Sequence, residues 1–282
     1  MPTLAAFVAI INRVLPEPAA GLLAGILFGT KASISTDLFD ALVVTGTLHI
    51  AALSGMNITI LTKLFFSTFI SVLPKFISSI LTIGVIVGFV FFVGSSPSIV
   101  RAAIMGSITL VAPLTGRMST ALITWGITIA SMLLVQPSLL LNLSFQLSGL
   151  ASLGIILFGK EFREQTDAAP SSLSHLSSLR YLFRKLWFLV KSELQTTLSA
   201  QVFTIPLILF TFGRLSLISP LTNLLIGWTI PIITGLGLVM CVLGWIWLPL
   251  GQLFAWGTWV FLEWLIQAVI LTSRIPLASI GK

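Results

Sequence analysis

The stretch LVVTGTLHIAALSGMNITILTKLFFSTFISV, residues 42–72, decides the fold class of this chain. It is apolar over far more than the ~20 residues that a helix needs to cross the hydrocarbon core of a bilayer. Such runs predict helices rather than a membrane β-barrel, because lipid offers no partner to an unpaired backbone group. Ser54-Gly55, near the middle of the run, is expected to kink or unwind the helix.

The composition of the whole chain agrees with a membrane protein. Of 282 residues, 56% are hydrophobic and 8% are charged, whereas about 25% are charged in a soluble domain. The mean hydropathy is +1.10. These values exclude a water-soluble enzyme domain, a disordered chain and a collagen-like fibre. The single cysteine, Cys241, excludes an intramolecular disulfide and argues against a cysteine-based zinc site.

The remaining apolar runs predict an all-α, polytopic helical membrane protein with about eight spanning helices. Further spans are expected at 77–94, 98–113, 119–135, 138–158, 187–212 and 219–273. The last run is too long for one helix, so we expect it to form two spans. The residues expected to break it are Pro231, Gly235, Gly237, Gly244, Pro249 and Gly251. Residues 1–282 are predicted to form a single membrane domain.

Residues 15–30 form a shorter apolar element near the N-terminus. A helix of about 11 residues is only ~16 Å long and cannot span the membrane. Gly21, Gly25 and Gly29 recur every four residues and form a smooth stripe, which lets another backbone approach closely. We expect a re-entrant half-helix or an interfacial helix here.

Basic residues in alternate loops predict the orientation. One side receives Lys75, Arg117, Lys160, Arg163, Arg180, Arg184 and Lys185, whereas the opposite loops, at 94–98 and 135–138, receive no Lys or Arg. By the positive-inside rule, the basic side faces the cytoplasm. The polar loop of about residues 159–186 is then cytoplasmic and the C-terminus faces out, although Arg274 and Lys282 run against the rule.

The end of this loop, SSLRYLFRKLWFLVK at 177–191, is amphipathic and predicts a basic cytoplasmic helix. Its cations are Arg180, Arg184, Lys185 and Lys191. One interpretation is an interfacial helix that lies on anionic lipid. The other is a basic collar at the exit of a path for an anionic polymer.

Polar residues at membrane depth are the candidate functional residues, because they are costly in lipid and usually face a bundle interior or a water-filled cavity. The candidates are His49, Ser54, Gly55, Asn57, Arg101, Gln146, Gln201, Arg214 and Asn223. In an intact helix, His49, Ser54 and Asn57 would share one polar face. That face would either line a path or form an interhelical hydrogen-bond cluster.

Arg101 lies about one turn inside a predicted span. Pointing inward, it would offer a fixed cation with five donors to phosphate oxygens. Pointing outward, it would extend its charge to the membrane surface. Glu263 is the only carboxylate deep in a span and is the candidate partner if Arg101 forms an ion pair. Arg214, in a short outer loop, fits a loop anchor better than a ligand.

The motifs of common enzymes are missing from the sequence. It has no GxxxxGK[ST], HExxH or CxxC motif. A nucleophile at Ser54 would need a base, and His49 lies on the same segment at a poor angle, which disfavours a Ser–His pair. We expect no catalytic residue, no cofactor and no metal site.

Five stretches carry a family resemblance. They are GLLAGILFG at 21–29, GTLHIAALSGMNI at 46–58, PSIVRAAIMG at 97–106, PSLLLNLSFQLSGLASLGIILF at 137–158 and SAQVFTIPLILFTFGRLSLISPLTNLL at 199–225. In this order they resemble the competence domain of the ComEC family, the polytopic channel for DNA internalisation in bacterial transformation. Each motif alone is weak, but the resemblance covers about residues 15–275.

The resemblance implies a channel for single-stranded DNA in the bacterial cytoplasmic (inner) membrane. Arg101 and Arg214 would supply charge on the outer half, and the 180–191 helix would supply it at the exit. The residues that would line or brace the middle are His49, Ser54, Asn57 and Gln146. The implied partners are single-stranded DNA, the lipid bilayer, a DNA receptor, a cytoplasmic helicase, and extracellular OB-like and nuclease-like domains encoded elsewhere.

This sequence departs from the pattern of the ComEC family in two ways, and both limit the activities that the resemblance implies for it. Asn57 stands where many relatives have a second histidine, which argues against a His–His metal site. Full-length relatives often carry an OB-like domain and a metallo-β-lactamase-like domain, and this chain has room for neither and no HxHxDH-type cluster.

Two other functions stay open. A secondary transporter for a small anionic solute would also use a broken helix near the midplane, but we find no convincing two-fold internal repeat. The chain could also serve as a structural membrane subunit that docks extracellular DNA-processing domains.

Overall fold

The computed structural model describes residues 3–30, 34–51, 54–116, 120–159, 178–275 and 279–281. This part of the chain is almost entirely helical, which confirms the predicted all-α class. The helices are α1 (Leu4–Val14), α2 (Ala19–Phe28), α3 (Thr36–Val44), α4 (Gly55–Ile70), α5 (Lys75–Val93), α6 (Pro97–Val111), η1 (Ala112–Thr115), α7 (Ala121–Val135), η2 (Pro137–Leu141), α8 (Leu143–Phe158), α10 (Ser178–Phe212), α11 (Ser219–Ile226), α12 (Thr229–Ile246) and α13 (Leu248–Ser273). Two short strands, β1 (Arg214–Ser216) and β2 (Ser279–Gly281), complete it.

The helices correspond to the predicted spans. Within the described residues, five segments are long and apolar enough to cross a membrane: α5, α6 with η1, residues 190–212 of α10, α12 and α13. The shorter apolar helices α4, α7 and α8 occupy the other three predicted positions. The chain is therefore a polytopic membrane protein, and the total of eight spans stays a prediction.

The long run 42–72 is broken, as expected. Helix α3 ends at Val44, and α4 begins at Gly55 after Ser54, whose backbone is extended at φ −106° and ψ 159°. Because the helix is broken, His49, Ser54 and Asn57 do not share the single polar face that an intact helix would give them. His49 lies in the turn between the two helices.

The run 219–273 is broken at positions that only partly match the expectation. The backbone is extended at Trp247, between α12 and α13, and α11 forms a separate short helix. Gly244 and Gly251 face each other across this hairpin, since a Cβ on Gly251 would lie 2.6 Å from Gly244 Cα. The other expected breakers, Pro231, Gly235 and Gly237, lie inside α12 and do not interrupt it.

Helix α2 is buried on all sides, because every residue from Ala19 to Phe28 is buried. The helix therefore packs inside the protein, and its depth in the membrane stays a prediction. The glycine stripe works as expected at Gly25, where an added Cβ would lie 2.7 Å from the carbonyl oxygen of Ala51. The sequence did not predict α1, which packs Ile11 and Val14 against this core.

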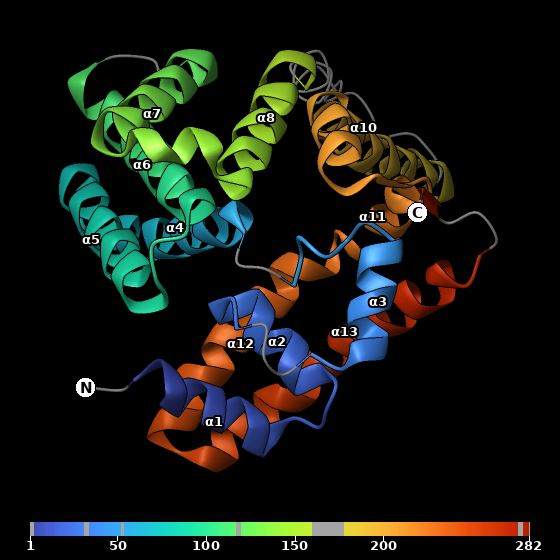
Figure 1. Ribbon diagram of the computed structural model, residues 1–282. Helices are drawn as coiled ribbons and strands as arrows, with labels where there is room; N and C mark the ends of the chain where they lie inside the picture. The colour runs from blue at the N-terminus through green and yellow to red at the C-terminus, as the bar shows by residue number, and fades with distance from the viewer. Residues whose placement is uncertain are drawn as a thin grey trace.

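Figure 1 shows α4 to α8 gathered in one part of the molecule and α1, α2, α12 and α13 in another. The larger hydrophobic core joins α1, α2, α3, α11, α12 and α13, and a smaller core joins α4, α5 and α6. Helix α10 packs closely on α8, where a Cβ on Gly154 would overlap the carbonyl oxygen of Ser199.

The strands bring the end of the chain back to the loop after α10. β1 and β2 pair antiparallel, with Arg214 opposite Gly281. Residues 279–281 therefore lie on the same side of the protein as the loop after α10, and the side of the membrane that they face stays a prediction.

Candidate functional site

The first group of candidate residues surrounds Arg101 on α6, and we call Arg101, Trp125, Ser152 and Gly55 the arginine cluster. Arg101 Nη1 donates to Ser152 Oγ on α8 at 3.0 Å. Trp125 Nε1 on α7 lies 3.1 Å from both Ser152 Oγ and the carbonyl oxygen of Gly149. The guanidinium therefore points between helices, as in the inward alternative.

Ser152 fixes the positions of Arg101 and Trp125, because all hydrogen-bonding positions of its hydroxyl group are occupied. It accepts from Arg101 and Trp125, and it can donate to the carbonyl oxygen of Gly149 at 2.8 Å or of Ser148 at 3.0 Å. A hydroxyl has one donor and two acceptor positions. Neither Ser152 nor Trp125 was singled out from the sequence, because an isolated serine or tryptophan in an apolar run gives no signal of its partner.

The broken start of α4 lies against Arg101. A Cβ on Gly55 would lie 3.5 Å from Arg101 Nη2 and 3.2 Å from Ala102 Cβ. Arg101 Nε is buried and has no hydrogen-bond partner among the described residues. The cluster thus places a cation with an unsatisfied donor beside the first turn of a helix, where backbone N–H groups also carry partial positive charge.

The second group lies around Ser219, and we call Gly46, His49, Gln201, Ser219 and Asn223 the serine cluster. Gln201 Nε2 donates to Ser219 Oγ at 3.1 Å, and Asn223 Nδ2 lies 3.4 Å from the same oxygen. His49 Nδ1 lies 3.2 Å from the carbonyl oxygen of Gly46. The fold thus brings Gln201 and Asn223 together at Ser219, and the turn that contains His49 approaches this serine through Gly46.

Gly46 is essential to the contact between the α3–α4 turn and this cluster. Its φ is +68°, a conformation that residues with a Cβ rarely adopt. A Cβ there would lie 2.9 Å from Ser216 Cβ and 3.3 Å from Ser219 Oγ. The His49 side chain is exposed at this turn.

Asn57 braces two other helices instead of joining either cluster. The side chain is buried, and Nδ2 donates to the carbonyl oxygen of Ile26 at 2.5 Å. That carbonyl belongs to the last turn of α2, whose carbonyl groups have no partner within the helix. The Thr234 hydroxyl of α12 donates to Asn57 Oδ1 at 3.4 Å. Of the two expected roles for Asn57, lining or bracing, this geometry favours bracing.

Gln146 has a local role in the structure. Its Nε2 donates to the carbonyl oxygen of Leu140 at 2.5 Å, which ties α8 to the preceding turn. Asn142 caps α8 by accepting from the backbone N–H groups of Ser144 and Phe145.

For several of the basic residues singled out from the sequence, the structure does not describe the side-chain contacts. The side chains of Arg180, Arg184, Lys185 and Arg214, and all of residues 160–177, lie outside the described part of the chain. Lys191 is exposed where the apolar part of α10 begins. The helical structure expected at 180–191 is present, because α10 begins at Ser178.

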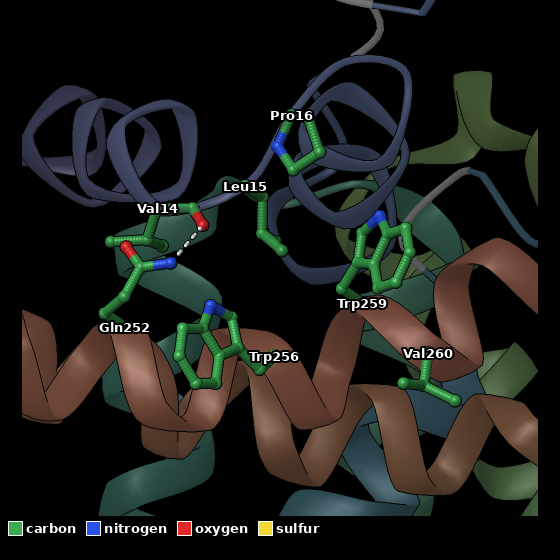
Figure 2. Close-up of a pocket in the computed structure, with 7 residues that line it drawn as sticks. All are labelled: Val14, Leu15, Pro16, Gln252, Trp256, Trp259 and Val260. Atoms are coloured by element: carbon green, nitrogen blue, oxygen red, sulfur yellow. Dashed lines mark hydrogen bonds between the residues drawn. The ribbon is translucent and has the colours of Figure 1, made fainter.

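A pocket of about 440 Å³ opens between the turn after α1 and helix α13, away from both clusters. Figure 2 shows Leu15, Trp256 and Trp259 around it, with Gln252 donating to the carbonyl oxygen of Val14 at 3.1 Å. Within the part of the chain that the structure describes, no charged side chain lines this pocket. It therefore offers apolar surface but no cation for a phosphate.

One cation inside a predicted span was not singled out from the sequence. Lys63 is exposed in the middle of α4. The signal was available, because a lysine within an apolar run is itself unusual. Among the described residues, no three His, Cys, Asp or Glu side chains group closely enough to hold a metal ion.

Comparison with known proteins gives the family. The model of the family described as "Competence protein" matches residues 26–281. The chain is 27% identical to ComE operon protein 3 of Bacillus subtilis (strain 168) over 218 residues, which are 76% of this chain and 25% of that protein. The chain thus spans about a quarter of the length of this relative, and no solved structure matches it significantly. With most of its length matched and the ComEC-type motifs in order, the chain belongs to the Competence protein family.

Proposed function

We propose that this chain forms a membrane path that carries single-stranded DNA across the bacterial cytoplasmic membrane during natural transformation. Its membership of the Competence protein family supports a role in DNA uptake. The observation that carries the finer proposal is the inward position of Arg101, held by Ser152 at 3.0 Å beside the start of α4.

A DNA strand crossing a membrane needs a wet path, cations matched to its phosphates and groups that tolerate any base. Arg101 suits the second need. Its Nη1 is engaged by Ser152, while Nε has no partner within the described residues and Nη2 lies toward Gly55. A planar guanidinium binds phosphate oxygens in a fixed orientation, and at Arg101 its terminal amino groups would do so, because Nε is buried.

The geometry of Arg101 disfavours both an outward anchor and an ion pair. A side chain bonded to Ser152 of α8 is not extended to the membrane surface. Glu263, the candidate ion-pair partner, instead accepts from Gln267 Nε2 at 2.8 Å within α13.

The remaining parts of an uptake system would come from other chains or domains. We propose extracellular OB-like and nuclease-like domains, a DNA receptor and a cytoplasmic helicase as partners. The chain itself would have no enzymatic activity.

The test is DNA uptake by competent cells in which variants of this chain replace the chromosomal copy, normalised to the amount of protein in the membrane. Arg101→Ala is expected to lower uptake at least tenfold, and Arg101→Lys to recover only part, because an ammonium keeps the charge but loses the planar donors. Arg274→Ala, at the exposed end of α13, is the matched control and should keep normal uptake.

Normal uptake in Arg101→Ala would overturn the proposal. Uptake of a small anion, instead of DNA, that depends on Arg101 would favour the transporter alternative. Loss of attached DNA-processing domains from the membrane, with no effect of Arg101→Ala, would favour the structural subunit.

A further inference from the structure

Lys63 is a charged side chain in the middle of α4, a shorter apolar helix that occupies one of the predicted spans. It is the ninth of the 16 residues of α4, about 12 Å beyond Gly55 at 1.5 Å per residue. The side chain is exposed, and no hydrogen bond or ion pair engages it within the described residues. The other cations whose side chains are described, apart from Arg101, lie at the ends of helices or apolar spans: Arg13, Lys75, Lys191 and Arg274.

The exposed face of α4 around Lys63 carries a row of polar side chains, with the exposed apolar Met56 and Ile70 one turn beyond its two ends. Thr59, Lys63 and Ser67 are exposed and recur every four residues, so they lie one above another on the helix. Thr59 and Ser67 donate to backbone carbonyls of their own helix, which leaves their oxygen lone pairs directed outward. Ser71, at the C-terminal end of α4, continues this row.

Helix α5, next to α4, has the apolar exposed surface that is expected of a helix in contact with lipid. The exposed large side chains of α5 beyond its first residue are all apolar, among them Phe76, Ile80, Val87 and Phe91. Helix α4 packs against α5 and α6 through Ile58 and Leu61, on the side opposite Lys63 and Ser67. An ammonium facing hydrocarbon at this depth is costly, whereas water or an anion stabilises it.

We infer that the Thr59–Lys63–Ser67 face of α4 is in contact with water and that the Lys63 ammonium binds phosphate groups of the DNA strand. This inference rests on the proposed function and adds a second cation to the path. Arg101 lies beside the first residue of α4 and Lys63 lies two turns further along the same helix. A strand that leaves Arg101 at the first turn of α4 and passes to the exposed face of this helix would meet Lys63 before it reaches Ser71.

The water contact can be tested without DNA transport. Single cysteines at 59, 63 and 67, in a Cys241→Ser background, would be treated with a charged, water-soluble thiol reagent in membranes open on both sides. Cysteines at Leu64 and Val87, which are exposed but lie on other faces, are the matched controls. We expect fast modification at 59, 63 and 67, slow modification at 64 and 87, and protection at 63 by a single-stranded oligonucleotide.

The second measurement is uptake per membrane-inserted protein. Lys63→Met keeps the length of the stem and removes the charge, and should lower uptake roughly fivefold, the order of magnitude for one cation at an anionic surface. Lys63→Arg should keep most of it. Lys75→Met, at the first residue of α5, is the control of equal charge change and should have little effect.

The outcomes separate this inference from the proposed function. Normal uptake in Lys63→Met together with tenfold loss in Arg101→Ala would overturn the role of Lys63 and leave the path in place. Normal uptake in both variants would overturn the path itself. Equal modification rates at 63, 64 and 87 would show Lys63 to be a lysine that extends to the membrane surface, and would overturn the water-facing assignment.

Discussion

Arg101 Nη1 on α6 lies 3.0 Å from Ser152 Oγ on α8, so a cation within one span is oriented by a hydroxyl of another. The same oxygen lies 3.1 Å from Trp125 Nε1, which adds α7 to the contact. Three consecutive helices thus fix the direction of one guanidinium. Polar contacts of this kind both hold membrane helices together and keep a charge away from lipid.

Replacing Ser152 by alanine should therefore release Arg101. We expect Ser152→Ala to lower DNA uptake several-fold, because a hydrogen bond to a charged group contributes about 1.5–3 kcal/mol. Ser152→Thr keeps the hydroxyl and should retain most activity. Uptake is measured per membrane-inserted protein, with Ser148→Ala as the control one turn away. Equal effects of Ser152→Ala and Ser152→Thr would mean that packing, and not the hydroxyl, is responsible.

Asn57→Ala should weaken the contact between α4, α2 and α12. It leaves the carbonyl oxygen of Ile26 buried without its donor and removes the acceptor for Thr234. We expect a loss of ~1–2 kcal/mol, the range found for hydrogen bonds between membrane helices. The measurement is thermal unfolding in detergent. Thr68→Ala, at an exposed residue of the same helix, should change little, and an equal drop there would contradict the bracing role.

Gly25→Ala should destabilise the buried helix α2. The new Cβ would lie 2.7 Å from the carbonyl oxygen of Ala51, and a backbone atom cannot move aside as a flexible side chain can. The expected cost is ~1–3 kcal/mol. Gly88→Ala is the matched control, since no atom of the described residues lies within 4 Å of an added Cβ there. The Gly25→Ala variant should accumulate less and unfold at a lower temperature than the Gly88→Ala variant. A stable Gly25→Ala protein would contradict the close approach between Gly25 and the Ala51 backbone.

The orientation predicts opposite labelling of the two ends of α5, with the end of α7 behaving like the second end of α5. Single cysteines at Ser96 and Gln136 should react with an impermeant thiol reagent from outside the cell, and a cysteine at Lys75 should react only after the membrane is opened. Because β2 pairs with β1 beyond α10, a cysteine at Ile280 should behave like one at Ser96. Labelling of position 96 only from the cytoplasmic side would reverse the orientation.

Much of the fold followed from the lengths of apolar runs. Helices α5, α6, α7 and α8 lie within a few residues of their predicted bounds, because the lipid environment permits only helices and the charged or glycine-containing breaks mark their ends. The start of α4 at Gly55 followed from Ser54-Gly55. Helix α1 was missed, because residues 4–14 are too short to be recognised as a span.

The sequence allowed us to predict which polar residues belong to the candidate sites, but not which residues they contact. Arg101, His49, Gln201 and Asn223 stood out as polar groups in apolar runs, and the fold joins the last two at Ser219. Their partners could not be predicted, since serines are frequent in this chain and carry no mark of position.

The sequence by itself determined that this chain is a bundle of membrane helices of the Competence protein family, since apolar run length and short motifs are local properties. Only the tertiary structure decided that α2 is buried on all sides, that Asn57 caps α2 at Ile26 and that Arg101 turns toward Ser152. The physical reason is that most faces of these helices are apolar. Helical periodicity then gives little indication of which face meets which neighbour, and the choice depends on close approach at glycines such as Gly25 and Gly154.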